Sequence, residues 1–344
     1  MEASKPKRRT QTGMGKEGVP MKKKHVLLIG MMICCLVLMK GFAFADPNDV
    51  VFSPPVAAEQ LAPLTEEEMA AAKPLIIEIA IEEGQVPEPQ VYPPAAYTYP
   101  FPFTRLEVFN VKKRAYKKYP YRTIGQLFFT IPGAGDFRCT GSVVEGSWVW
   151  TAGHCTVTPD PSNPNWHTNF TFVPGARGTK QPFGVWAYDN LSVSVVGWAV
   201  QGLLCYDLGG VRFQRNAKGK SLEEKLGALG FLANASREQH WNQFGYPAAA
   251  PFDGTKLIQS QSSIGEDDPF MDCDPKPIGV GNDMTGGSSG GPWIVGFGGK
   301  GSPNSINGLN SYKYIIPDRP DAMYGPYFGD AAQNIYNYMK DNPN

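Results

Sequence analysis

The sequence predicts an all-β fold, a barrel or a sandwich, for most of the chain beyond Tyr119. Short apolar runs recur there, and clusters of Gly, Pro, Asn and Asp separate them, as is typical of strands joined by turns. The clearest runs are at residues 127–129, 143–144, 148–150, 193–196, 211–213 and 293–295. No repeat of roughly 20 to 50 residues is visible, which argues against a propeller or a solenoid.

Helical periodicity is clear only at the C-terminus. Asp330 is placed to cap a helix, and Gln333 follows it by three positions. The residues of one helical face are Ala331, Ala332, Ile335, Tyr338 and Met339. Ser221 and the acidic residues after it resemble a second helix start, which Gly227 and Gly230 weaken.

The N-terminus has the features of an export signal. Three lysines precede the apolar run 26–39, and Ala43-Phe44-Ala45 follows as a small-x-small cleavage pattern. We therefore expect residues 1–45 to be an N-terminal extension and a cleaved signal peptide, with Met1, Met14 or Met21 as the start. The alternative is a retained anchor, for which the apolar run is short.

Residues 46–114 are rich in Pro, Ala and Glu, and this composition predicts a largely disordered segment. Residues 46–104 carry ten acidic side chains and one Lys, whereas 105–123 carry seven basic side chains and one Glu. Thr65 begins a short capping-box pattern. The segment is either a propeptide that a cut in the basic cluster 112–118 removes, or an acidic linker.

Charge and cysteine content limit which ligands and partners the sequence predicts. Lys plus Arg and Asp plus Glu number 32 each, so no overall field favours nucleic acid or an anionic membrane. Signal cleavage leaves four cysteines, which in an exported chain predict two disulfides: Cys139, Cys155, Cys205 and Cys273. No pair has CxxC spacing and few histidines remain, so we expect no metal site.

The strongest motif is Thr-Gly-Gly-Ser-Ser-Gly-Gly-Pro-Trp at 285–293. Glycines on both sides would let Ser289 stand on a tight turn as an acyl-transfer nucleophile. The backbone amides of Gly287 and Ser289 would then form the oxyanion hole. Taken alone, the motif also fits a Gly-Ser-rich surface loop.

Two further residues complete a possible triad. His154 follows an apolar run in Thr-Ala-Gly-His-Cys, where a disulfide from Cys155 to Cys139 would fix its backbone. Asp207 lies between His154 and Ser289 and enters the apolar run 211–213, as expected for a carboxylate that orients an imidazole. Asp189 is the rival carboxylate, in a more polar turn.

Chain order separates two hydrolase folds. The Gly-x-Ser-x-Gly pattern around Ser289 also fits the α/β-hydrolases, but these need a histidine after the serine. The last histidine here is His240, so that interpretation fails. The order His, Asp, Ser is that of the chymotrypsin-like barrels.

Residues 115–344 resemble the secreted trypsin-like serine peptidases related to the V8 and glutamyl endopeptidases. The resemblance rests on the His154 and Ser289 motifs and on the segments 119–127, 244–247 and 308–312. It implies an all-β fold of two six-stranded antiparallel barrels with a C-terminal helix. It also implies a secreted, cofactor-free endopeptidase that acts on proteins or peptides and is made as a precursor. We expect a monomer. The alternative is a catalytically weak or inactive binding protein on the same scaffold.

Departures from this family bear on activation and specificity. Ser288 stands where trypsin has the Asp that pairs with the new N-terminus, so that activation switch is absent. Asn282 stands where relatives often have a Cys, which suggests that Cys273 pairs with Cys205. Asp283 occupies the position that floors the primary pocket and attracts Arg or Lys, unless it bonds to its own loop instead. Asn310 replaces the His of glutamate-specific relatives, which argues against a glutamate preference.

Overall fold

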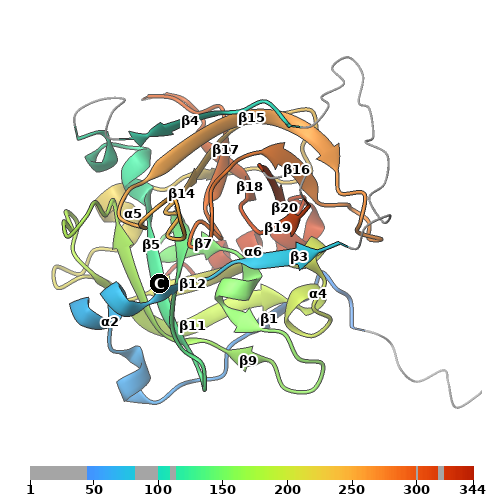
Figure 1. Cartoon of the computed structure of the whole chain (residues 1–344). Coiled ribbons are helices and arrows are strands. Elements are labelled where there is room, and N and C mark those ends of the chain that lie inside the picture. The colour runs from blue at the N-terminus through green and yellow to red at the C-terminus, as the bar shows by residue number, and fades with distance from the viewer. Residues whose placement is uncertain (1–44, 82–99, 109–113, 300, 317–320) are drawn as a thin grey trace, which may run out of the picture. The chain divides into compact units, whose positions relative to one another are not determined.

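The computed structural model describes residues 45–81, 100–108, 114–299, 301–316 and 321–344 (Figure 1). The chain divides into two units, Met1–Ala45 and Asp46–Asn344. The predicted signal peptide falls outside the described residues. In the described part, no helix is long and apolar enough to cross a bilayer.

Six antiparallel strands close into a barrel in the first half of the described chain. They are β5 (Ile124–Ile131), β6 (Gly135–Glu145), β7 (Trp148–Thr151), β10 (Thr168–Pro174), β11 (Trp186–Val195) and β12 (Gly209–Phe213). The order is β10-β5-β6-β7-β12-β11, and pairing between β10 and β11 closes the ring. Five of the predicted apolar runs coincide with these strands, although the run 193–196 extends one residue beyond β11. All residues of the five runs except Arg212 are buried.

The second half forms a curved sheet that stays open within the described residues. Its strands are β13 (Gly230–Phe231), β14 (His240–Gly245), β15 (Ile258–Asp267), β16 (Ile278–Gly281), β17 (Pro292–Val295), β18 (Ser305–Leu309), β19 (Tyr312–Ile315) and β20 (Ala322–Gly325). With β3 (Ile77–Ala80) at the end, the order is β13-β18-β17-β14-β15-β16-β20-β19-β3. The prediction of two six-stranded antiparallel barrels is confirmed as a double-barrel architecture, in which the second half is a half-barrel. Its outer positions belong to β13 and β3, which pair in parallel with β18 and β19.

Residues 46–81 fold onto both sheets, although their composition predicted little order. Their elements are β1 (Val50–Phe52), η1 (Ala58–Leu61), α2 (Glu66–Ala71), β2 (Lys73–Pro74) and β3 (Ile77–Ala80). β1 pairs with β11, β2 with β6 and β3 with β19, and Figure 1 shows the segment crossing from α2 to β3. Further along, β4 (Thr104–Glu107) pairs with β15. Order arises because existing strand edges supply hydrogen-bond partners, which composition does not record.

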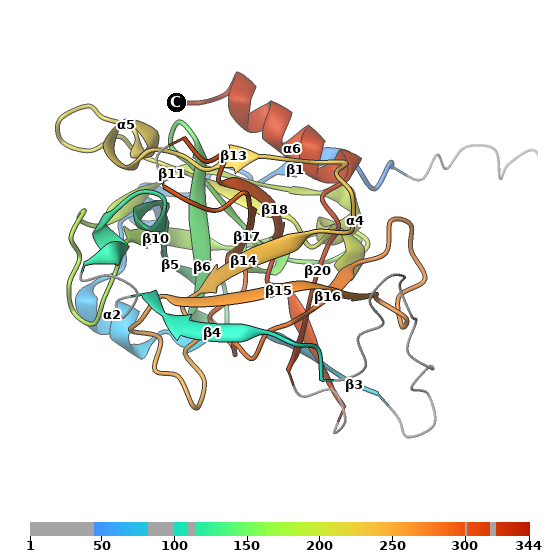
Figure 2. The same cartoon turned by 90° about the horizontal axis from the view of Figure 1, so that it is seen from above.

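The predicted helix starts are present. In α2 and α5 (Leu222–Leu226), Thr65 and Ser221 each form a capping box with the Glu three positions later. The C-terminal helix α6 (Asp330–Asp341) lies beside β1 and β11 (Figure 2), but its N-cap is Gly329 rather than Asp330. The remaining short elements are η2 (Ala115–Lys117), η3 (Tyr121–Thr123), η4 (Gly153–Cys155), β8 (Val157–Thr158), β9 (Asn165–Trp166), α4 (Val196–Ala199) and η5 (Leu204–Tyr206).

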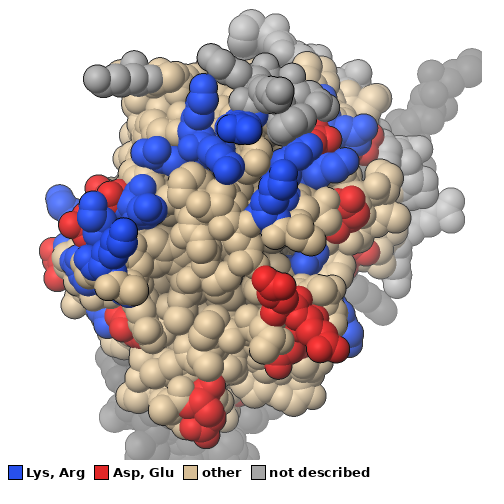
Figure 3. All heavy atoms as spheres, turned by 90° about the vertical axis from the view of Figure 1, so that its left-hand side faces the viewer, with Lys and Arg blue, Asp and Glu red and all other residues tan. Residues whose placement is uncertain are grey.

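Each half has its own aromatic core. Trp148 and Trp150 are fully buried in the barrel, and Trp241 and Trp293 in the second sheet. On the face shown in Figure 3, Lys and Arg side chains gather in the upper part and at the left, with some Asp and Glu among them, and two further acidic groups lie lower down. This face therefore carries both signs of charge, in line with the balanced composition.

Candidate active site

His154 and Asp207 meet at one end of the closed barrel. His154 lies on η4, directly after β7, and Asp207 directly follows η5. Asp207 Oδ2 is 2.7 Å from His154 Nδ1, and Asp207 Oδ1 accepts the backbone N–H of His154 at 2.6 Å. A neutral imidazole that donates from Nδ1 to this carboxylate keeps Nε2 as an acceptor.

The surroundings lock this pair in place. Ser311 Oγ donates to Asp207 Oδ2 at 2.5 Å, and the Asp207 side chain is fully buried. The imidazole meets Trp198 edge to face at 6.3 Å between ring centroids. A Cβ on Gly153 would lie 2.6 Å from Trp198 and 3.0 Å from Asp207 Oδ1. The glycine before His154 is therefore required by close packing.

Ser289 lies on a tight turn between β16 and β17. Gly287 and Gly290 on either side have φ of 92° and 78°, values that favour glycine. A Cβ on Gly290 would lie 2.0 Å from Thr151 Oγ1, so a side chain does not fit there. The neighbouring Ser288 hydroxyl instead donates to Thr285 O at 2.8 Å. Of the two serines in the motif, Ser289 is the one directed toward the His154 side.

A backbone carbonyl of the N-terminal segment lies against this turn. The oxygen of Leu75 accepts the N–H of Gly287 at 3.0 Å and the hydroxyl of Ser289 at 3.2 Å. Gly287 is one of the two predicted oxyanion donors. Leu75 O thus contacts both the predicted nucleophile and part of the predicted oxyanion hole.

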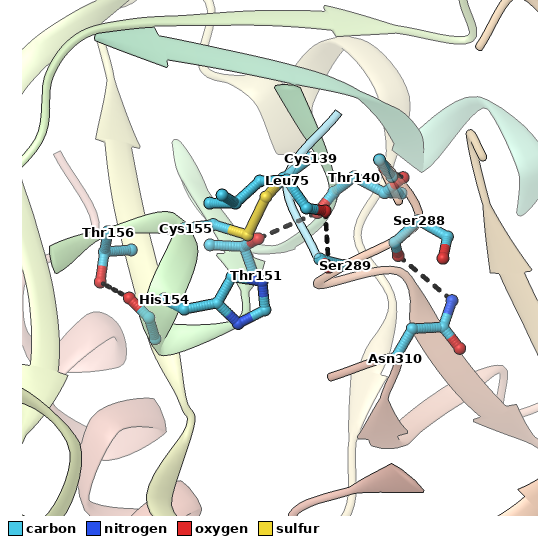
Figure 4. Close-up of a disulfide and its surroundings, with 12 residues drawn as sticks. Leu75, Cys139, Thr140, Thr151, His154, Cys155, Thr156, Ser288, Ser289 and Asn310 are labelled. Atoms are coloured by element: carbon cyan, nitrogen blue, oxygen red, sulfur yellow. Dashed lines mark hydrogen bonds between the residues drawn. A yellow bond between two sulfur atoms is a disulfide. The ribbon is translucent and has the colours of Figure 1, made fainter. Parts of the chain in front are cut away.

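Figure 4 shows the His154 imidazole on the same side of the turn as Ser289. Within the described residues, His154 Nε2 is buried and has no hydrogen-bond partner. His154 is 6% exposed and Ser289 2% exposed. The serine proton is therefore directed to Leu75 O, while the imidazole acceptor is left free.

Two solved structures resemble the chain over nearly their whole length. The thermostable serine protease AL20, from an extremophilic microorganism, is 34% identical, with a TM-score of 0.57 over 64% of this chain and 97% of that one. The protease Anisep from Arthrobacter nicotinovorans is 34% identical, with a TM-score of 0.56 over 64% and 96%. The chain belongs to the chymotrypsin-like serine protease family.

Other comparisons are more limited. A Glu endopeptidase is similar in fold at 18% identity, with a TM-score of 0.51. The match covers 69% of the present chain and 96% of the Glu endopeptidase. An extracellular metalloprotease of Bacillus subtilis is 33% identical over 95 residues, which are 27% of this protease and 29% of that protein. The chain thus spans less than a third of this curated relative. No protein-family model matches the chain.

Among the described residues, the cluster that comes nearest to a metal-ligand arrangement does not fit a metal. In the described part, the one group of three potential ligands within 4.8 Å of one another is Cys139, His154 and Cys155. A disulfide joins the two cysteines, so neither offers a thiolate. The second predicted disulfide, Cys205–Cys273, is also formed.

Asp283 contacts another segment of the protease chain. Arg105, on β4, places Nη1 against Asp283 Oδ2, while Asp283 Oδ1 is buried with no hydrogen-bond partner among the described residues. Burial raises the pKa of Asp283, and Arg105 opposes this shift. The carboxylate expected to attract a substrate Arg or Lys thus already holds a guanidinium.

Asn310 braces the Ser289 turn. Its Nδ2 donates to Phe244 O at 3.0 Å and to Ser288 O at 3.2 Å, and its Oδ1 accepts from Trp293 Nε1 at 2.8 Å. The side chain is fully buried. Its amide is used inside the protein rather than presented to a ligand.

Sequence reasoning did not assign roles to Ser311, Trp198 or Leu75. Ser311 lies in the 308–312 segment that carries the family resemblance, so its position was visible although its bond to Asp207 was not. Leu75 carries no sequence signal, because its backbone oxygen, not its side chain, makes the contact.

Proposed function

We propose that the chain is a secreted serine endopeptidase that hydrolyses peptide bonds through an acyl-enzyme. Ser289 is the nucleophile, His154 the general base and acid, and Asp207 the residue that orients the imidazole and stabilises its charged form. The amides of Gly287 and Ser289 bind the oxyanion. The observation that carries the proposal is the buried His154–Asp207 pair, which two hydrogen bonds join.

Acylation starts when Ser289 Oγ attacks the substrate carbonyl carbon and its proton passes to His154 Nε2. The carbonyl oxygen gains the negative charge and binds the two amides. When the tetrahedral adduct collapses, the C–N bond breaks and His154 gives the proton to the leaving amine. The acyl group remains on Ser289 as an ester.

Deacylation repeats these steps with water. His154 Nε2 takes a proton from the water as its oxygen attacks the ester carbon, and then returns that proton to Ser289 Oγ. Asp207 needs no protonation at any stage. The full cycle consumes one water per peptide bond and requires no cofactor.

We further propose that the protease is exported and that residues 46–114 are a propeptide. The two disulfides support an oxidising compartment. Contacts of β2 and β3 beside Ser289 support a role for this segment in the precursor. A processing cut within the basic cluster 112–118 would detach it.

Casein hydrolysis by the secreted chain after limited trypsin treatment tests the assignment. Ser289→Ala should remove turnover by about 10⁴-fold or more while leaving the unfolding temperature unchanged. Ser288→Ala is the matched control and should retain activity, because its hydroxyl bonds to Thr285 O. Wild-type activity in Ser289→Ala would refute the proposal and favour the inactive binding protein.

A further inference from the structure

Residues 73–80, which we name the strap, lie across the candidate active site and pair with both sheets. β2 pairs with β6 through Lys73–Phe137 and Pro74–Arg138. β3 pairs with β19 in a four-residue ladder from Ile77–Tyr312 to Ala80–Ile315. Between them, Leu75 N–H donates to Arg138 O at 3.1 Å. The strap is therefore held as an extended peptide, with Leu75 between its two pairings.

Side-chain packing adds to this ladder. Ile77 and Ile79 are half-buried against the tyrosines of β19 and β20, whereas Glu78 and Ala80 are exposed. Pro74 and Ile76 lie against Gly286, where an added Cβ would be 3.3 Å from each. The strap therefore covers the Ser289 turn and occupies the outer edge of β19, an edge that a peptide strand can join by β-addition.

The hydrogen bond from Ser289 to the strap is not an attacking geometry. For attack, the serine proton must point to His154 Nε2 and an oxygen lone pair must point to the carbonyl carbon. Here the Ser289 hydroxyl donates a hydrogen bond to the Leu75 carbonyl oxygen, and Nε2 has no partner among the described residues. The contact thus occupies Ser289 and the Gly287 amide without starting the reaction.

The direction of the strap is also wrong for cleavage. The half of a substrate that leaves as an amine must lie on the imidazole side, since His154 protonates it. The Cys139–Cys155 disulfide ties the strand β6 to the residue after His154, so β6 lies on that side. The strap places its N-terminal half on β6 and its C-terminal half on β19, and both pairings are parallel. A peptide that is cleaved here would run in the opposite direction, with its N-terminal half on β19 and its C-terminal half on β6.

We propose that the strap is an autoinhibitory strand that occupies the substrate groove in reverse and keeps the uncut chain inactive. This inference rests on the proposed function and deepens it. Once the strap is detached, β19 and β6 offer free edges to an extended peptide of opposite direction. The strap thus binds at the active site and is not cleaved there.

Labelling of the uncut secreted chain with a fluorophosphonate probe tests the proposal. The double variant Ile77→Asp/Ile79→Asp loses the apolar contacts of β3 and should be labelled at least about tenfold faster than the parent, at the uncut size on a gel. The matched variant Glu78→Gln/Ala80→Ser changes the exposed positions of the same strand and should be labelled at the parent rate.

Equal labelling rates of the parent and the double variant would overturn the autoinhibitory role of the strap and leave the proposed function intact. Absence of labelling in every form, including the trypsin-treated chain, would refute the proposed function and the strap with it. A synthetic peptide of residues 71–81 provides a second measurement that does not depend on the folding of the double variant. It should slow labelling of the trypsin-treated parent and remain intact by mass spectrometry. Cleavage of this peptide between Leu75 and Ile76 would contradict the reversed binding.

Discussion

Ser289 Oγ donates a hydrogen bond of 3.2 Å to the carbonyl oxygen of Leu75, a residue 214 positions earlier in the chain. Gly287 N–H donates to the same oxygen at 3.0 Å. These contacts join the Ser289 turn of the second sheet to a segment that also pairs with the first barrel. In the proposed autoinhibition, the activity of the precursor depends on residues that contribute no side chain to the proposed triad.

Replacing Asp207 with Asn should lower kcat by about 10⁴-fold, because an amide cannot hold the imidazole in the required tautomer. The measurement is peptide hydrolysis by the trypsin-treated protease. Asp189→Asn is the matched control, since Asp189 pairs with Arg212 at 2.7 Å on β11 and β12. A comparable loss in Asp189→Asn, with Asp207→Asn active, would assign the orienting role to the rival carboxylate.

Gly290→Ala should destabilise the fold by more than about 2 kcal/mol, because it combines positive φ with a clash against Thr151 and Thr140. Gly133→Ala has a similar φ of 83° but no atom within 4 Å of the added Cβ, so it should cost about 1 kcal/mol. Urea unfolding of both variants measures the difference. Equal losses would show that packing around the Ser289 turn is looser than described.

Because of His167, the free energy of unfolding should decrease as the pH is lowered into the acid range. The ring of His167 stacks on Phe129 in the core. Burial there lowers the pKa of His167 from 6.5 to about 3. Because the unfolded chain binds the proton first, stability is lost as pH falls from about 6.5 toward 3, by up to about 1.4 kcal/mol per pH unit. His167→Gln should remove this slope in urea midpoints measured between about pH 7 and 4, whereas the exposed His240→Gln should keep it. An unchanged slope in His167→Gln would contradict the assignment.

Asp283→Asn should reduce cleavage after Arg or Lys by at least about tenfold relative to cleavage after Leu. The contact with Arg105 shows that this carboxylate accepts a guanidinium. A panel of peptides that differ only at the cleaved residue gives the measurement. Asp267→Asn, at a partly buried pair with Arg237, is the control and should leave the ratio unchanged. Equal cleavage after Arg, Glu and Leu by the parent would reject Asp283 as the specificity residue.

Local patterns in the sequence predicted much of the structure. The barrel strands follow from apolar runs between turn residues, and the starts of α2 and α5 follow from capping boxes that involve neighbouring residues only. The contact between His154 and Asp207 was predictable because motif and chain order carry it. Both disulfides were predicted as well, the second through the family resemblance.

What the sequence did not reveal depends on partners distant in the chain. The segment 46–81 is ordered by pairing with β6, β11 and β19, strands that lie far from it in the sequence. Leu75 acts through its backbone, which every residue possesses. The open second sheet is another non-local outcome, since β3 takes an outer position that a closed barrel would not offer.

Mass-spectrometric mapping of a fluorophosphonate adduct on the trypsin-treated protease examines the triad most directly. The probe reacts with a serine only where a neighbouring base removes its proton and amides hold the developing charge. We expect a single adduct on Ser289, lost in His154→Ala and retained in Ser288→Ala. An adduct on another residue, or undiminished labelling of Ser289 in His154→Ala, would contradict the proposed mechanism.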